Sequence, residues 1–166
     1  MIKTDPKIYF IMGVSGCGKS TIGSLLAKEL KIPFYDGDDY HSKTNVKKMA
    51  SGQPLTDEDR IGWLLKLNEL ALNKREEGAI IGCSALKEAY RQILDANLQE
   101  NARWIYLSGS FEDVMNRLHQ RKGHFMPAEL LKSQFETLEI PQKAIKVSIN
   151  MPPDEIVNRI LGLISS

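Results

Sequence analysis

The strongest constraint on this chain lies at residues 7–21, which read K-I-Y-F-I-M-G-V-S-G-C-G-K-S-T. Residues 8–12 form a short apolar run rich in β-forming types, and a G-x-x-x-x-G-K-S motif follows at residues 13–20. An amphipathic segment then begins, with Ile22 and Leu26 on one side. Strand, glycine-rich loop and helix in this order are the context in which the motif binds phosphate, whereas a chance glycine-rich turn needs neither neighbour. The sequence therefore predicts a nucleotide site here.

The residue types of this loop suit phosphate for physical reasons. Gly13, Gly16 and Gly18 let the backbone turn with positive φ and approach a ligand without a Cβ clash. Successive N–H groups can then point into one concavity at the positive end of a helix. Lys19 can reach the β- and γ-phosphates, and the Ser20 hydroxyl can bind Mg²⁺.

Length and composition indicate one domain over residues 1–166, with hydrophobic content of 42% and a formal net charge of +1. Such a charge gives no large positive field, so we expect no nucleic-acid partner. The N-terminus lacks the apolar core of a signal peptide, and no apolar run approaches the roughly 20 residues of a membrane helix. Cys17 and Cys83 make no disulfide framework, so reduced thiols and a cytoplasmic location are expected.

Strand-like and helix-like segments alternate along the rest of the chain, which predicts an α/β fold with a mostly parallel sheet between two helical layers. The predicted strands cover residues 8–12, 33–36, 79–83, 104–107 and 146–149. The predicted helices cover about 19–30, 57–77, 85–98, 111–121 and 128–136, and a last one begins at 153. Residues 41–60 show no clean periodicity until Arg60 and are interpreted as a polar, irregular region. The helix starting at Asp57 is expected to bury Ile61, Leu64, Leu65 and Leu72, with Trp63, Leu67 and Leu70 widening that face.

An acidic cluster, D-G-D-D at residues 36–39, follows the second predicted strand. Ligands of open α/β sheets bind beyond the carboxyl ends of the strands. Phosphoryl transfer to an alcohol needs Mg²⁺ on the phosphates, a group that orients and deprotonates the hydroxyl, and positive charge on the transferring oxygens. We expect Asp38 to be that base and Asp36 to hold Mg²⁺, through water because this ion sheds water reluctantly. An Asx-rich turn after the strand is the alternative.

The polar region could bind a second substrate through His41, Asn45, Lys48 and Arg60, because long insertions often carry binding sites. A lone histidine such as His41 is more often structural than functional, and both interpretations stay open. Arg60 would lie in the first turn of a helix, where the helix dipole disfavours a cation. That position hints at an anionic ligand, although Asp57 and Asp59 could be its partners instead.

Two pairs of cations stand four residues apart, a spacing that places each pair on one helix face. Lys87 and Arg91 could grip a carboxylate, or form a solvated surface with Glu88. Arg117 and Arg121 complement a helix C-terminus, which is a sufficient structural reason for them. The functional alternative is a lid within about residues 121–140 that excludes water and brings an arginine to the γ-phosphate.

Six segments together resemble the gluconate kinase (gluconokinase) family of P-loop small-molecule kinases, over nearly the whole chain. They are M-G-V-S-G-C-G-K-S-T at 12–21, D-G-D-D-Y-H at 36–41, N-V-K-K-M-A-S-G-Q-P-L-T-D-E-D-R at 45–60, C-S-A-L-K-E-A-Y-R at 83–91, R-K-G-H-F at 121–125 and L-L-K-S-Q-F-E-T-L-E-I-P at 130–141. The phosphate loop is widespread, whereas the other segments are far more specific. Ser42 and Ser148 depart from the residues common in the family at these positions.

The resemblance implies ATP- and Mg²⁺-dependent phosphorylation of D-gluconate to 6-phospho-D-gluconate, a sheet of order 2-3-1-4-5, a lid and often a homodimer. The alternatives are another kinase of this fold, acting on a shikimate-like acid or a nucleoside monophosphate, and a nucleotide switch, for which no guanine-reading N-K-x-D sequence is present. By position, the nucleotide-binding residues would be Gly13, Val14, Ser15, Gly16, Cys17, Gly18, Lys19, Ser20, Thr21 and Arg117. The catalytic residues would be Lys19, Asp38 and Arg121, and the metal-binding residues Ser20 and Asp36. The substrate-binding residues would be Asp38, His41, Arg60, Lys87, Arg91 and His124.

Overall fold

Five parallel strands form one sheet in the order β2-β3-β1-β4-β5, in a computed structural model that describes residues 8–120 and 127–165. The strands are β1 (Ile8–Met12), β2 (Phe34–Asp36), β3 (Ala79–Gly82), β4 (Ala102–Ser108) and β5 (Ile145–Ser148). The expected strand order is confirmed, and the predicted strand positions agree with the observed ones to within two residues at each end.

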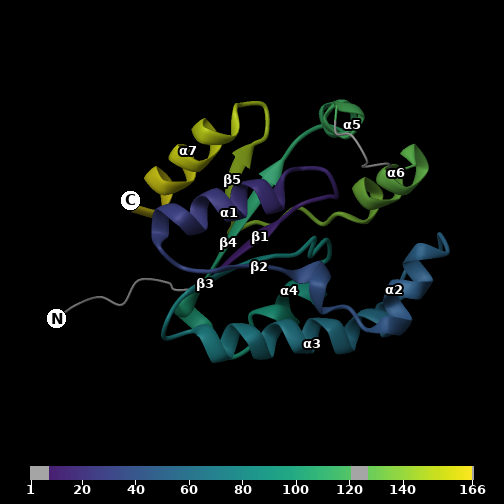
Figure 1. Cartoon of the computed structure of the whole chain (residues 1–166), viewed down its shortest axis with the longest axis horizontal. Helices are drawn as coiled ribbons and strands as arrows, with labels where there is room; N and C mark the ends of the chain where they lie inside the picture. Colours follow the sequence, from purple (N-terminus) through teal and green to yellow (C-terminus); the bar gives the residue numbers. More distant parts are fainter. Residues whose placement is uncertain (1–7, 121–126, 166) are drawn as a thin grey trace.

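Helices cover both faces of the sheet, so the expected three layers are present (Figure 1). The helices are α1 (Lys19–Leu30), α2 (Lys43–Ala50), α3 (Asp57–Lys74), α4 (Glu88–Leu94), α5 (Phe111–Gln120), α6 (Ala128–Thr137) and α7 (Pro153–Ser165). Short 3₁₀ helices, η1 (Gly37–Tyr40) and η2 (Gln99–Asn101), precede α2 and β4. Figure 1 shows α1 and α7 on one side of the sheet and α3 on the other, with α2 and α6 at the same end of the molecule.

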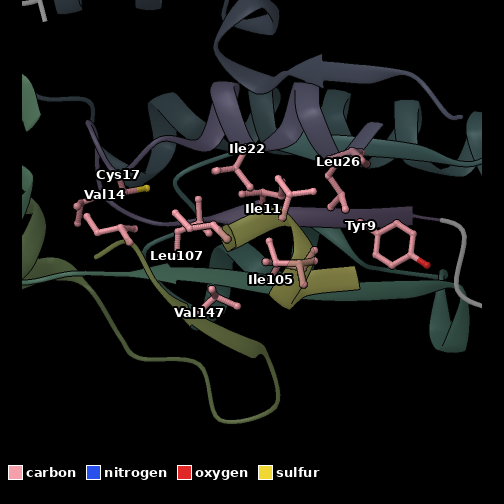
Figure 2. Close-up of a cluster of buried hydrophobic side chains, with 14 of the residues drawn as sticks. Tyr9, Ile11, Val14, Cys17, Ile22, Leu26, Ile105, Leu107 and Val147 are labelled. Atoms are coloured by element: carbon pink, nitrogen blue, oxygen red, sulfur yellow. The ribbon is translucent and has the colours of Figure 1, made fainter. Parts of the chain in front are cut away.

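The central strand β1 is buried along its whole length because its side chains alternate between two apolar clusters. Ile11 belongs to the cluster that contains Ile22 and Leu26 of α1, and Figure 2 shows these side chains together. Phe10 belongs to the cluster on the opposite face, with Leu64 of α3. This two-sided burial fixes the point at which the chain leaves β1 and enters the glycine-rich loop.

The polar region contains helix α2, so its interpretation as irregular was wrong. Ser42, one of the departures from the family pattern, is the N-cap: its hydroxyl accepts a hydrogen bond from the Asn45 N–H at 3.1 Å. Asn45 is buried and donates through Nδ2 to the Asp59 carbonyl at 2.8 Å. The apolar side chains Val46 and Met49 are exposed, so α2 has no apolar stripe that periodicity could reveal.

The buried face of α3 differs from the predicted one. Ile61 and Leu65 are 46% and 55% exposed, whereas Trp63, Leu64 and Leu67 are buried. The indole N–H of Trp63 donates to the carbonyl of Gly37 at 2.7 Å, which fixes the rotation of the helix. The orientation of α3 therefore follows from a contact with η1 as well as from apolar burial.

Helix α4 is shorter than the predicted helix over 85–98. Ala85 has a left-handed backbone with φ of 46° on one side, and Asn97 and Gln99 have φ of 65° and 50° on the other. Non-glycine residues in the left-handed region interrupt a right-handed helix.

Within the described residues, no helix combines the length and apolar character needed to cross a membrane.

Candidate active site

A cavity of about 630 Å³ lies where the carboxyl ends of β1, β2 and β3 meet. Its walls come from the glycine-rich loop, the start of η1, the segment joining α2 to α3, the β3–α4 loop and one face of α6. Segments far apart in the sequence thus share one hollow, at the edge where open α/β sheets bind ligands.

The glycine-rich loop has the conformation that the motif predicts. Gly18 adopts a left-handed backbone with φ of 99° and is the N-cap of α1. A Cβ at Gly13 would lie 2.7 Å from the Cys17 Sγ and 2.9 Å from the Leu107 carbonyl oxygen, so a side chain there has no room. Lys19 Nζ donates to the carbonyl of Gly13 at 2.9 Å and of Val14 at 3.0 Å. The ammonium group therefore already lies across the loop, next to the α1 N-terminus.

Ser20 and Asp36 bring two oxygen atoms together from different elements. The Ser20 hydroxyl donates to Asp36 Oδ2 at 3.1 Å, while Asp36 Oδ1 accepts the Asp38 N–H at 3.0 Å. The Asx turn raised as an alternative is thus present, and it leaves Asp36 in contact with Ser20. Among the described residues, no group of three or more His, Cys, Asp or Glu side chains could hold a metal ion. A hydroxyl–carboxylate pair suits Mg²⁺, which takes most of its ligands from water and phosphate.

Asp38 lines the cavity together with Lys19 and His41. Burial by the surrounding protein, followed by the neighbouring carboxylate of Asp36, raises the pKa of the Asp38 carboxyl. Its side chain still has exposed surface, because the cavity is open to water while protein surrounds it on several sides. Asp38 therefore faces the hollow that contains the phosphate loop and lies outside the apolar core.

His41 also lines the cavity and has a defined structural environment. Its ring stacks on the Trp63 indole with centroids 4.0 Å apart and planes at 17°. The Asn45 Nδ2 lies 3.4 Å from its Nδ1. Burial lowers the pKa of His41 and the Arg60 charge adds to this effect, while Asp38 opposes it. A neutral imidazole at pH 7 can both donate and accept a hydrogen bond.

Arg60 reaches the cavity from the first turn of α3. Its Nη1 donates to the Leu55 carbonyl at 2.8 Å and to the Tyr90 hydroxyl at 3.2 Å, and lies 4.0 Å from Asp57 Oδ1. Asp57 also binds the Tyr90 hydroxyl and accepts from Lys87 Nζ at 3.3 Å. The acidic neighbour considered from the sequence is therefore present, yet Arg60 still faces the cavity. Lys87 is bound to Asp57 and is not among the described residues that line the cavity.

Arg91 occupies a buried position, with only 4% of its surface exposed. Its guanidinium donates to the Ala85 carbonyl at 2.6 Å, to the Glu139 carbonyl at 2.8 Å and to Glu88 Oε2 at 3.1 Å. Arg91 is not among the described residues that line the cavity, whereas Ala85 and its neighbour Leu86 are. Arg91 thus supports the cavity wall from behind.

Arg117 of α5 lies beside the phosphate loop. Its Nη2 donates to the Ile149 carbonyl at 2.6 Å, and its Nη1 lies 3.1 Å from the place of a Cβ on Gly18. Arg121 and His124 fall outside the described residues, as does the part of the predicted lid at 121–126. The later part of that segment is α6, which forms a cavity wall.

Sequence reasoning did not select several residues that line the cavity, among them Trp63, Tyr90, Ser133, Gln134 and Thr137. All of them stand inside or next to segments that carry the family resemblance, but no chemical pattern marked them. The fold brings two of them, the Trp63 and Tyr90 rings, to the cavity from distant positions in the sequence.

Comparison with known proteins places this geometry in a family. The shikimate kinase family model matches residues 15–162. A probable gluconokinase from Mus musculus is 46% identical, over 94% of this chain and 96% of that protein. The thermosensitive gluconokinase of Escherichia coli K12 is 45% identical, over 86% and 79% of the two chains. This chain belongs to the gluconokinase family.

Solved structures agree with this assignment. The crystal structure of a gluconokinase from Sinorhizobium meliloti has a TM-score of 0.89 and 37% identity, over 98% of this chain and 94% of that one. The shikimate kinase of Aquifex aeolicus, with a TM-score of 0.58 and 22% identity, shares the fold alone. The P-loop kinase fold expected from the sequence is therefore confirmed for this chain.

Proposed function

We propose that this protein transfers the γ-phosphoryl group of ATP to the terminal hydroxyl of D-gluconate, forming 6-phospho-D-gluconate and ADP. One observation carries the proposal: the phosphate-loop Lys19 and the carboxylate of Asp38 line the same cavity, although they follow different strands. The gluconokinase relatives, 40–46% identical over most of the chain, support gluconate as the acceptor.

The nucleotide side of the reaction belongs to the glycine-rich loop. Its backbone N–H groups and the α1 N-terminus would bind the phosphates of ATP, with Lys19 moving from the loop carbonyls to the β- and γ-phosphates. Ser20 and Asp36 would hold Mg²⁺, which when bound neutralises charge on the phosphate oxygens. Arg117 stands next to the loop and would add positive charge there.

The acceptor side belongs to Asp38, His41 and Arg60. The gluconate hydroxyl oxygen forms the new bond to the γ-phosphorus as the bond to the ADP oxygen breaks, and Asp38 takes the hydroxyl proton. Arg60 would bind the gluconate carboxylate and His41 one of its hydroxyls, since both line the cavity.

The remaining predicted site residues either act indirectly or stay predictions. Lys87 and Arg91 would act through Asp57 and the β3–α4 loop, because their side chains are bound there. Arg121 as a catalytic cation and His124 as a substrate contact stay predictions from the sequence, as do a cytoplasmic location and a homodimer.

A panel of acceptors tests the proposal directly. Purified protein with ATP and Mg²⁺ is assayed for ADP release with gluconate, shikimate and nucleoside monophosphates. We expect gluconate to give rates far above those of the other acceptors and of the acceptor-free background. Gluconate turnover no faster than background would overturn the assignment, and preference for another acceptor would favour the alternative kinase of this fold.

A further inference from the structure

The side chain of Gln134 joins helix α6 to the phosphate loop. Its Oε1 accepts the Ser15 N–H at 2.8 Å, and its Nε2 donates to the Ser15 hydroxyl at 3.1 Å. Gln134 and Ser15 are 119 positions apart in the sequence. Two hydrogen bonds between one amide and one residue define both distance and orientation, so this contact sets where α6 lies relative to the loop.

Just beyond the C-terminus of α6, Glu139 joins the same segment to the β3–α4 loop, which also lines the cavity. Glu139 Oε1 accepts the Glu88 N–H at 2.7 Å, and the Glu139 N–H donates to the Leu86 carbonyl at 2.7 Å. The Arg91 guanidinium adds the bond to the Glu139 carbonyl. The segment from α6 to Glu139 thus bridges the phosphate loop and the β3–α4 loop.

The face of α6 that carries Gln134 forms a wall of the cavity. Leu130, Ser133, Gln134 and Thr137 line the hollow, at the spacing of one helix face. The other side of α6 packs on the protein, since Leu131 is buried and the Phe135 ring meets Phe111 edge-on with centroids 6.0 Å apart. A shift of α6 would therefore change the width of the cavity directly.

We propose that Gln134 is a positioning residue for the acceptor: by fixing α6 to Ser15, it sets the distance between the α6 wall and the transferring phosphate. This inference rests on the proposed kinase function. It differs from a role in nucleotide affinity, because Lys19, Ser20 and the α1 N-terminus keep their own contacts without Gln134. In-line transfer depends steeply on alignment. Loss of the Gln134–Ser15 contact should therefore lower turnover of the acceptor and let ATP be hydrolysed without phosphorylation of the acceptor.

The Gln134→Ala variant tests the inference through a split between the two substrates. We expect kcat/KM for gluconate to fall by about tenfold or more, the loss that corresponds to ~1.4 kcal/mol. The affinity for a non-hydrolysable ATP analogue, measured by calorimetry, should stay within about threefold, the scale of ~0.7 kcal/mol. The ratio of ADP to phosphorylated acceptor should rise above one, because a misplaced acceptor lets water compete. Gln142→Ala, an exposed glutamine beyond α6, is the matched control and should change none of these values.

Two outcomes would overturn the inference: an equal loss of analogue affinity and of acceptor kcat/KM, or wild-type values for all parameters. Ser15→Ala removes the hydroxyl partner from the loop side, so the pair also allows a double-mutant cycle. Independent losses that simply add in the double variant would contradict coupling through this contact. If Gln134→Ala is poorly folded, Gln134→Glu takes its place in the cycle, because a glutamate keeps an acceptor for the Ser15 N–H. Should the wild type prefer another acceptor, the proposed function fails while the same split, measured with that acceptor, still tests Gln134.

Discussion

Asp38 and Asp39 are neighbours in the sequence, but only Asp38 of this pair lines the cavity. Asp38→Asn should lower kcat by about 10²–10⁴-fold, the usual contribution of a general base. The affinity for an ATP analogue should be retained, because the phosphate loop is unchanged. Asp39→Asn, which makes the same chemical change one position along, should keep wild-type kinetics. An active Asp38→Asn enzyme would contradict the role as base.

The raised pKa of Asp38 predicts a pH dependence for both activity and stability. The carboxylate is the active form, so kcat/KM should fall with decreasing pH along a limb whose pKa lies above the ordinary aspartate value of about 3.9. The folded state binds this proton more tightly than the unfolded state, so ionisation of Asp38 costs stability as the pH rises past the unfolded value. Asp38→Asn should therefore leave Tm at pH 7 equal or higher. A lower Tm, or an acid limb at the ordinary value, would contradict this account.

For single residues, the sequence predicted positions correctly where the residues belong to one local motif. The glycines, Lys19 and Ser20 stand at fixed offsets, so their joint position could be predicted. The burial of Arg91 was not predicted, because spacing on a helix reveals a shared face but does not tell whether that face meets solvent, ligand or backbone carbonyls. Gln134 and Tyr90 gave no signal, since neither type has a required neighbour in the sequence.

Among the helices and strands, prediction depended on an apolar period. Strand β1 and helix α1 show that period and were predicted closely, whereas α2 relies on the Ser42 cap and buried Asn45. The face of α3 was set partly by the Trp63 hydrogen bond to Gly37, a partner that lies 26 residues earlier. Caps and long-range polar contacts of this kind are invisible to periodicity.

The loop between β3 and α4 offers a test of how elements support the site. Arg91→Met should lower the free energy of unfolding by about 1–3 kcal/mol, because the Ala85 and Glu139 carbonyls lose their donor. It should also raise KM for gluconate while ATP-analogue affinity stays near wild type. Arg75→Met, an exposed arginine at the C-cap of α3, is the control and should change stability by less than about 0.5 kcal/mol. Wild-type stability for Arg91→Met would show that the guanidinium does not support this wall.

For the whole molecule, alternation of strands and helices predicted the class of fold, and the family resemblance supplied the order of the strands. Strand order is not encoded in any single segment, because β1 pairs with β3 and β4, which lie about 70 and 95 residues further along. The cavity follows from that order, since β1, β3 and β2 are neighbours in the sheet and their carboxyl ends meet beside the phosphate loop.

The two cysteines provide a probe of the whole fold. Cys17 is fully buried in the phosphate loop, and Cys83 is 1% exposed at the end of β3. Burial raises the pKa of the Cys83 thiol to about 12, so little reactive thiolate exists at pH 8. We expect both thiols to react with a disulfide reagent in denaturant and only very slowly in the native protein, at a rate that follows unfolding.

Ligand binding should slow this reaction further, because a nucleotide that binds the folded state alone stabilises it by about 2.7 kcal/mol at a hundredfold excess over Kd. Labelling is therefore measured with and without ATP and Mg²⁺, and with Lys19→Ala, in which the nucleotide effect should vanish. Lys28→Ala, an exposed lysine on the same helix, should retain that effect. Fast native labelling of Cys17 alone would instead reveal a phosphate loop that opens locally, contrary to a loop held in shape by the packing around β1 and α1.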